Sequence, residues 1–219
     1  MTIPGWPGTP DWPDHTGFPY PPARTIPRRE GPVAVPMVDL PSASPDELLR
    51  RQRRVLCPGP LDAATATRVT AELMALDGRS ADDVELVVNS EGGPLADVLV
   101  ILDVIGLMRA QVDTLCIGRA SGTAAIVLAC GSGQRRVAAR ATVTLRVRQD
   151  ERVEGSVADV RRQLDELAHV RTQVIALVVA ATGMTEEEVQ ADLDVGRPYE
   201  ATAAVRRGLA DEVAGGTGR

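Results

Sequence analysis

Hydrophobic positions follow two alternating patterns from residue 44 to residue 213. Apolar residues three or four positions apart, as in segment 62–76, predict amphipathic helices. Short aliphatic runs between the helices, as in 84–88 and 112–117, predict buried strands. The expected order is helix 44–54, strand 55–57, helix 62–76, strand 84–88, helix 95–109, strand 112–117, helix 123–130, strand 143–147, helix 156–182, a capped helix from 185, helix 200–207 and strand 209–213. This order predicts an α/β fold of successive βα units.

The segment 156–182 predicts the longest helix. At 1.5 Å per residue it would run roughly 40 Å, which is too long for a compact single-layer domain to cover. Its apolar stripe includes Leu164 and Leu167. We therefore expect this helix to project or to pack against a second subunit, with Leu164 and Leu167 as oligomerisation residues.

The first 33 residues have a different composition from the rest of the chain. Twelve of the 16 prolines fall within the first 45 residues, together with the aromatic residues Trp6, Trp12, Phe18 and Tyr20. We expect an extended or disordered arm at 1–33, one domain at 34–215 and a short tail at 216–219. An alternative is that the arm docks into a groove of a partner or of a neighbouring copy.

The overall charge and the lack of long apolar segments narrow the class of protein. The 24 basic and 30 acidic residues give a net charge of −6, so we expect no nucleic-acid binding. No run of 18 apolar residues and no signal-peptide pattern occurs, so we expect a soluble cytoplasmic protein without a membrane span. The three cysteines are widely spaced, and neither a metal site nor a cofactor is expected.

The set of possible nucleophiles and bases is small. The chain has no lysine, which excludes a phosphate-binding Walker A loop and a Ser/Lys catalytic pair. The imidazoles are His15, in the arm, and His169, which we interpret as an ordinary histidine on the helix surface. Cys116 and Cys130 fall in a predicted buried strand and at a helix end, so we expect them to be structural.

Two turns between a strand and a helix could carry chemistry. They are 89–93, with the sequence NSEGG, and 118–123, with the sequence GRASGT. If the two strands are neighbours, backbone amides of both turns would converge at helix N-termini and could form an oxyanion hole. Glycine at such turns is also common for structural reasons alone.

These turns resemble those of ClpP, the family of proteolytic subunits of the ATP-dependent Clp protease. Segment 88–93, VNSEGG, is similar to the family's INSPGG, and segment 116–120, CIGRA, is similar to CIGQA. Segment 208–211, GLAD, is similar to GLVD near the family's C-terminus. The resemblance runs from Asp46 to about Val213. It implies a ClpP/crotonase-like spiral of βαβ units with a projecting handle helix, here 156–182.

The resemblance also implies where a Ser/His/Asp triad would lie. The three positions hold Gly122, Val147 and Gly196, and a shift of one residue at the second would give Arg146 or Arg148. None of these residues can act as nucleophile, base or acid, and the neighbouring Ser121 has no base beside it. We therefore expect a pseudoprotease that is not an enzyme. The family's oxyanion-hole amides correspond to Gly93 and Thr123.

The resemblance further implies partners. We expect a catalytically inactive subunit with a structural or regulatory role in a Clp-type ring, as a homo-oligomer in a heptameric ring or stacked rings, with active ClpP subunits as candidate partners. The family's aromatic docking positions for the ATPase hold Glu85, Val87 and Val137, which puts docking of the usual unfoldase in doubt. Two alternatives remain open. They are an acyl-thioester enzyme of the crotonase type that uses the oxyanion hole, and a homomeric scaffold without a protease partner.

Overall fold

The computed structural model describes residues 44–147 and 156–215. The predicted arm 1–33, the tail 216–219 and Arg148 lie outside these ranges. In chain order the elements are α1 (Pro45–Arg51), β1 (Arg54–Pro60), α2 (Ala63–Asp77), β2 (Val84–Gly92), α3 (Leu95–Leu107), β3 (Val112–Gly122), α4 (Ala124–Ala129), β4 (Arg135–Ala138), β5 (Thr142–Leu145), α5 (Val157–Thr182), α6 (Glu186–Val195), β6 (Pro198–Glu200), α7 (Ala201–Arg206) and β7 (Glu212–Ala214). The predicted α/β fold is confirmed.

The strands form one mainly parallel sheet in the order β1-β2-β3-β4-β7. Strand β3 changes partner along its length: Thr114–Cys116 pairs with β4, and Arg119–Gly122 pairs with β5. Gly118 lies between these two halves with φ +68°, a left-handed conformation that favours glycine. Strand β6 adds to β5 in the antiparallel sense. This branching brings β5 and β6 next to the C-terminal end of β3, where the candidate site lies.

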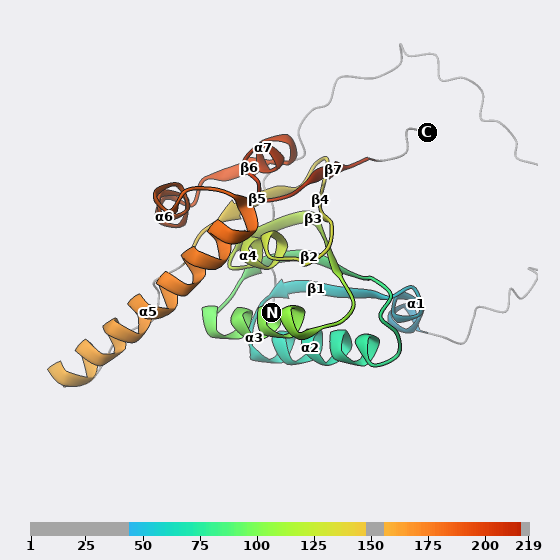
Figure 1. The fold of residues 1–219 in the computed structure, drawn as a ribbon, viewed down its shortest axis with the longest axis horizontal. Helices are drawn as coiled ribbons and strands as arrows, with labels where there is room; N and C mark the ends of the chain where they lie inside the picture. The colour runs from blue at the N-terminus through green and yellow to red at the C-terminus, as the bar shows by residue number, and fades with distance from the viewer. Residues whose placement is uncertain (1–43, 148–155, 216–219) are drawn as a thin grey trace, which may run out of the picture. The chain divides into compact units, whose positions relative to one another are not determined.

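Alternation along the strands defines the buried face of the sheet. Val84, Leu86 and Val88 of β2 are fully buried, whereas Glu85 points to the opposite face. Helices α2 and α3 run alongside this part of the sheet in Figure 1, and α2 packs on both β1 and α3. All six residues of α4 are buried, and this short helix contacts β2, β3 and α5. The core therefore lies between the sheet and these helices.

Helix α5 has the extent that the sequence predicts. Ser156 and Asp159 form a capping box at its start, and Gly183 ends it with φ +71°. Val174 and Val178 in its C-terminal half are fully buried, and its N-terminal half extends beyond the neighbouring elements in Figure 1. The predicted projection is thus confirmed. Leu164 and Leu167 lie in this helix, but their side chains are outside the described set, so their role in oligomerisation stays a prediction.

Several boundaries differ from the prediction. Strands β4 and β6 were not expected, because β4 begins with two arginines and β6 has three residues. Helix α3 ends at Leu107 rather than at 109, since Met108 is extended and the Arg109 backbone N–H donates to the Asp77 carboxylate. Strand β5 ends at Leu145, so Val147 lies just beyond it.

Among the described residues, no single helix is long and apolar enough to cross a membrane. One bent pair of segments, Asp159–Thr182 with Glu186–Val195, passes the same test of length and composition when taken together.

Candidate functional site

The two glycine turns lie side by side, as the sequence predicts for neighbouring strands. Strands β2 and β3 are parallel neighbours, and Ser90 of the first turn is paired with Ala120 of the second. Gly92 has φ +86°, and a Cβ there would lie 2.7 Å from the Ser121 carbonyl oxygen and 2.8 Å from the Thr123 nitrogen. Only glycine allows the two turns to approach this closely.

The Gly93 amide is already hydrogen-bonded within the protein. Its N–H donates to Thr123 Oγ1 over 2.9 Å, and the Thr123 hydroxyl donates in turn to the Gly93 carbonyl oxygen over 3.0 Å. The Thr123 side chain therefore holds the place that an oxyanion would take on the Gly93 amide. The oxyanion hole of Gly93 and Thr123 stays a prediction, and it requires the Thr123 hydroxyl to move away first.

The three positions that the resemblance assigns to a triad come together around Arg146. A Cβ on Gly122 would lie 3.6 Å from the Arg146 carbonyl oxygen, and a Cβ on Gly196 would lie 2.7 Å from Arg146 Cδ. Val147 follows Arg146 directly and is half-buried against the core. The Arg146 side chain thus lies across Gly196 in space that any larger residue at 196 would need.

Sequence reasoning named Arg146 as an alternative at one triad position and missed its contact with Gly196. The contact depends on Gly196, which has a left-handed backbone at φ +65° and lacks the Cβ that would meet the Arg146 side chain. Arg146, just beyond the end of β5, and the helix-ending Gly196 are 50 positions apart and carry no shared pattern in a single sequence. One signal could have revealed this contact. The family resemblance places both 146, or its neighbour 147, and 196 in the triad, and this chain has a large arginine at 146 and a glycine at 196.

The thiols are unsuited to act as nucleophiles. Cys116 is fully buried in β3, and Cys130 is half-buried at the end of α4, as predicted. Burial raises the pKa of the Cys116 thiol to about 12 and that of Cys57 and Cys130 to about 11. All three are therefore protonated near neutral pH, and the protonated thiol is a poor nucleophile.

The remaining candidate groups lie on the surface. His169 is exposed on α5, and its Nε2 is 3.2 Å from the Gln173 amide nitrogen, which fits the predicted surface histidine. Glu91 pairs with Arg119 at 3.2 Å, and both side chains are exposed, so this carboxylate is not a desolvated acid beside the turns. Within 44–147 and 156–215, no group of three or more His, Cys, Asp or Glu residues could hold a metal ion.

Glu85, one of the three implied docking positions for the ATPase, forms ion pairs on both sides. Its Oε2 is 2.7 Å from Arg54 Nε, and its Oε1 is 2.5 Å from Arg136 Nη2. The three side chains come from β1, β2 and β4, and the pair between Glu85 and Arg136 spans the intervening β3. Glu85 is therefore neutralised from both sides within the sheet, and whether an unfoldase docks at these positions stays a prediction.

Comparison with known proteins identifies the family. The family model described as Clp protease matches residues 42–217. The chain belongs to the Clp protease family. It is 34% identical over 167 residues to ATP-dependent Clp protease proteolytic subunit 1 of Nocardia farcinica, covering 75% of this chain and 84% of that protein. It is 30% identical over 173 residues to proteolytic subunit 3 of Frankia casuarinae, covering 78% and 81% of the two chains.

These comparisons contradict one expectation. From the residues at the implied triad positions we expect that the chain is not an enzyme. The matching family is one of proteases, and the relatives are named as proteolytic subunits. The expectation is therefore wrong as it stands: the residues Gly122, Val147 and Gly196 do not by themselves remove this chain from a family of proteases.

Proposed function

We propose that this chain is a ring-forming subunit of a Clp-type protease assembly with a structural or regulatory role. The proposed partners are further copies of the chain, in a heptameric ring or stacked rings, and other proteolytic subunits of the same kind. The assembly as a whole keeps the proteolytic function that the family name states.

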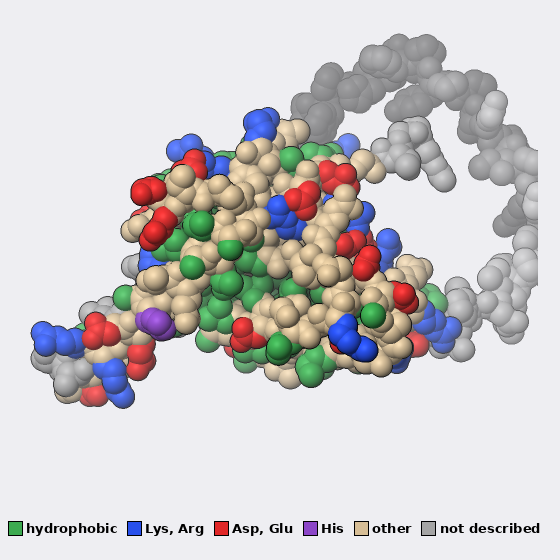
Figure 2. All heavy atoms as spheres, in the orientation of Figure 1, with side chains coloured by type: hydrophobic (Ala, Val, Ile, Leu, Met, Phe, Trp, Pro, Cys, Tyr) green, Lys and Arg blue, Asp and Glu red, His purple; other side chains and the backbone are tan. Residues whose placement is uncertain are grey.

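The observation that carries the proposal is the extended N-terminal half of α5 together with exposed apolar side chains. Leu107 is 84% exposed and Val100 is 49% exposed on α3, and Leu177 on α5 is 40% exposed. Figure 2 shows hydrophobic side chains gathered between α5 and α3, with charged side chains at the projecting end of α5. Contiguous apolar surface of this kind marks protein–protein contacts. A subunit that joins copies side by side and through α5 would cover both regions.

The arrangement around Arg146 supports a regulatory element within that role. Arg146 is exposed, and its side chain crosses Gly196 at the positions where the family resemblance places a triad. A cation there changes the charge that a peptide meets in the ring. A subunit of this kind would alter the substrate preference of a mixed assembly as well as its geometry.

The experiment mixes the purified chain with active ClpP subunits from the same cell at increasing ratios. We expect one joint species by size-exclusion chromatography and a peptidase rate of the mixture that differs from the sum of the rates of the separate proteins. The double variant Leu164→Glu with Leu167→Glu should weaken assembly, whereas the control Arg161→Glu, at an exposed position of the same helix, should not. Separate elution with an unchanged rate would contradict the proposal and would favour a homomeric scaffold.

A further inference from the structure

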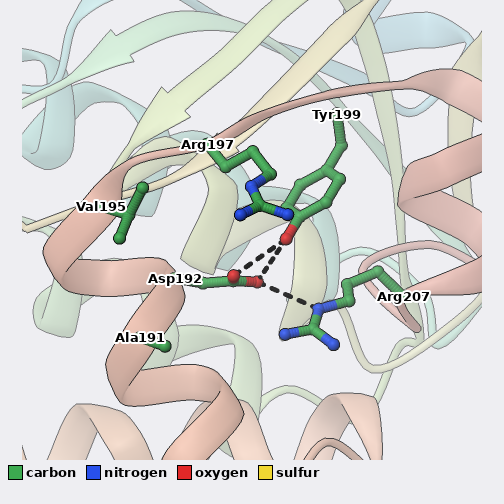
Figure 3. Close-up of a pocket in the computed structure, with 6 residues that line it drawn as sticks. All are labelled: Ala191, Asp192, Val195, Arg197, Tyr199 and Arg207. Atoms are coloured by element: carbon green, nitrogen blue, oxygen red, sulfur yellow. Dashed lines mark hydrogen bonds and ion pairs between the residues drawn. The ribbon is translucent and has the colours of Figure 1, made fainter.

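A cavity of about 300 Å³ lies at the C-terminal end of α6, beside β6 and α7 (Figure 3). Its lining combines two arginines, one carboxylate, one phenol and two small apolar side chains: Ala191, Asp192, Val195, Arg197, Tyr199 and Arg207. Neither the family match nor the triad positions assign a role to this cavity. A hollow with a few convergent polar groups and an apolar part is typical of a small-ligand site.

The one carboxylate of the lining, Asp192, already accepts hydrogen bonds from two side chains. Asp192 is buried, with 6% of its surface exposed. Its two oxygens lie 2.8 and 2.9 Å from the Tyr199 hydroxyl, which donates its proton to them, and Arg207 Nε donates over 3.1 Å. Figure 3 shows these three side chains pointing toward one another. Asp192 therefore already has a donor on each oxygen, and a ligand would not need to supply a further one.

The two arginines of the lining, Arg197 and Arg207, have N–H groups that can still donate hydrogen bonds to a ligand. Arg207 uses Nη1 for Glu188 at 2.6 Å and Nε for Asp192, and its Nη2 has no hydrogen bond to the described residues. Arg197 is exposed at the cavity and forms no ion pair with any residue that the structure describes. The cavity thus offers N–H donors and positive charge to a ligand.

We propose that this cavity binds a carboxylate carried on a short aliphatic stem, such as the C-terminal carboxylate of a peptide. A guanidinium donates two parallel hydrogen bonds to a carboxylate, and Arg197 is the group free to do so. Ala191 and Val195 give the stem an apolar wall. A phosphate dianion fits less well, because Asp192 and Glu188 already place two negative charges beside Arg207. This site goes beyond the proposed function and does not rest on it.

Two sources could supply such a group: a peptide terminus and a free short-chain acid. The experiment titrates the full-length chain by isothermal calorimetry with acetyl-dialanine, its C-terminal amide and butyrate. We expect saturable binding of acetyl-dialanine with a Kd of about 1 mM, as suits a ligand of this size. Binding of butyrate as tight as that of the peptide would assign the site to free acids, and weaker binding of butyrate would assign it to peptide termini. Equal binding of the amide would overturn the proposal, because the carboxylate would then be irrelevant.

Two substitutions test whether the peptide binds in this cavity. Arg197→Gln should weaken acetyl-dialanine binding at least tenfold, whereas the matched control Arg79→Gln, at another exposed arginine, should leave the Kd unchanged. Ala191→Leu should also weaken binding, because it fills the cavity without changing its charge. Both replaced side chains are exposed, so the fold should tolerate these changes. No saturable binding by the parent chain, or an unchanged Kd in Arg197→Gln, would overturn the proposal.

Discussion

The side chain of Arg146 lies directly over Gly196, and a Cβ at 196 would come within 2.7 Å of Arg146 Cδ. Gly196 ends α6 with φ +65°, so two separate features favour glycine there: the left-handed backbone and the close side chain. These features can be measured apart, because Gly183 ends α5 with a similar φ of +71° and has nothing within 4 Å of its missing Cβ.

We therefore predict that Gly196→Ala destabilises the protein more than Gly183→Ala does. Each change costs about 1–2 kcal/mol from the left-handed backbone, and Gly196→Ala costs about 1 kcal/mol more because Arg146 must shift. The free energy of unfolding in urea measures both. In an Arg146→Ala background the two glycine changes should cost the same. If Gly196→Ala and Gly183→Ala lower the unfolding free energy equally in the parent background, the close contact with Arg146 does not affect stability.

The Thr123 hydroxyl should stabilise the contact between the two glycine turns. Thr123→Val keeps the size of the side chain and leaves the Gly93 N–H without its acceptor, so we expect a loss of about 1–3 kcal/mol. Thr123→Ser should lose less, because it keeps the hydroxyl. Thr67→Val is a matched control, since within the described part of the chain the hydroxyl of this exposed threonine bonds to a carbonyl of its own helix. If thermal unfolding shows the same stability for both valine variants, the turn contact is not stabilising.

Arg135 connects β4 to three other parts of the chain. Its Nη1 donates to the carbonyl oxygens of Ala129, Ala181 and Gly208, and its other nitrogens pair with Asp211. The Arg135 side chain is only 14% exposed, so Arg135→Gln should cost about 3 kcal/mol of unfolding free energy. The control Arg50→Gln, at an ion pair with 41% exposure, should change stability by less than about 1 kcal/mol. Similar losses in the two variants would argue against Arg135 as a connecting residue.

The same contact predicts a pH dependence. The hydrogen bonds from the Arg135 side chain hold the pKa of Asp211 below its ordinary value of 3.8. The folded state therefore binds fewer protons than the unfolded state, so this stabilisation is present above pH 3.8 and is lost as the pH falls through the folded pKa. Urea unfolding between pH 6 and pH 2 should show a shallower acid loss for Asp211→Asn than for the parent. Identical pH profiles would contradict this assignment.

The sequence predicts the succession of strands and helices well where apolar periodicity is strong. Helix α5 is found within one residue, because a serine cap begins it and a glycine ends it. Strand β4 escapes notice because its first two residues are arginines, and Arg135 is satisfied by carbonyl groups that are distant in sequence. Local pattern cannot reveal a polar side chain that is stabilised by such long-range contacts.

The candidate site is likewise predictable from the sequence only in part. The convergence of the two glycine turns follows from strand order, which the alternation of elements makes predictable. The bond between Gly93 and Thr123 and the position of Arg146 depend on side-chain directions, which pairing of strands does not fix. The ion pairs around Glu85 likewise join residues of three strands, which the sequence does not reveal.

Native mass spectrometry of the full-length chain, alone and mixed with active ClpP subunits from the same cell, tests the proposed role most directly. The account predicts closed rings, and in the mixture it predicts rings whose masses correspond to defined numbers of both subunits. The variant Leu164→Glu with Leu167→Glu should shift the distribution toward smaller species. A chain that remains monomeric alone and forms no mixed ring with the active subunits would contradict the account.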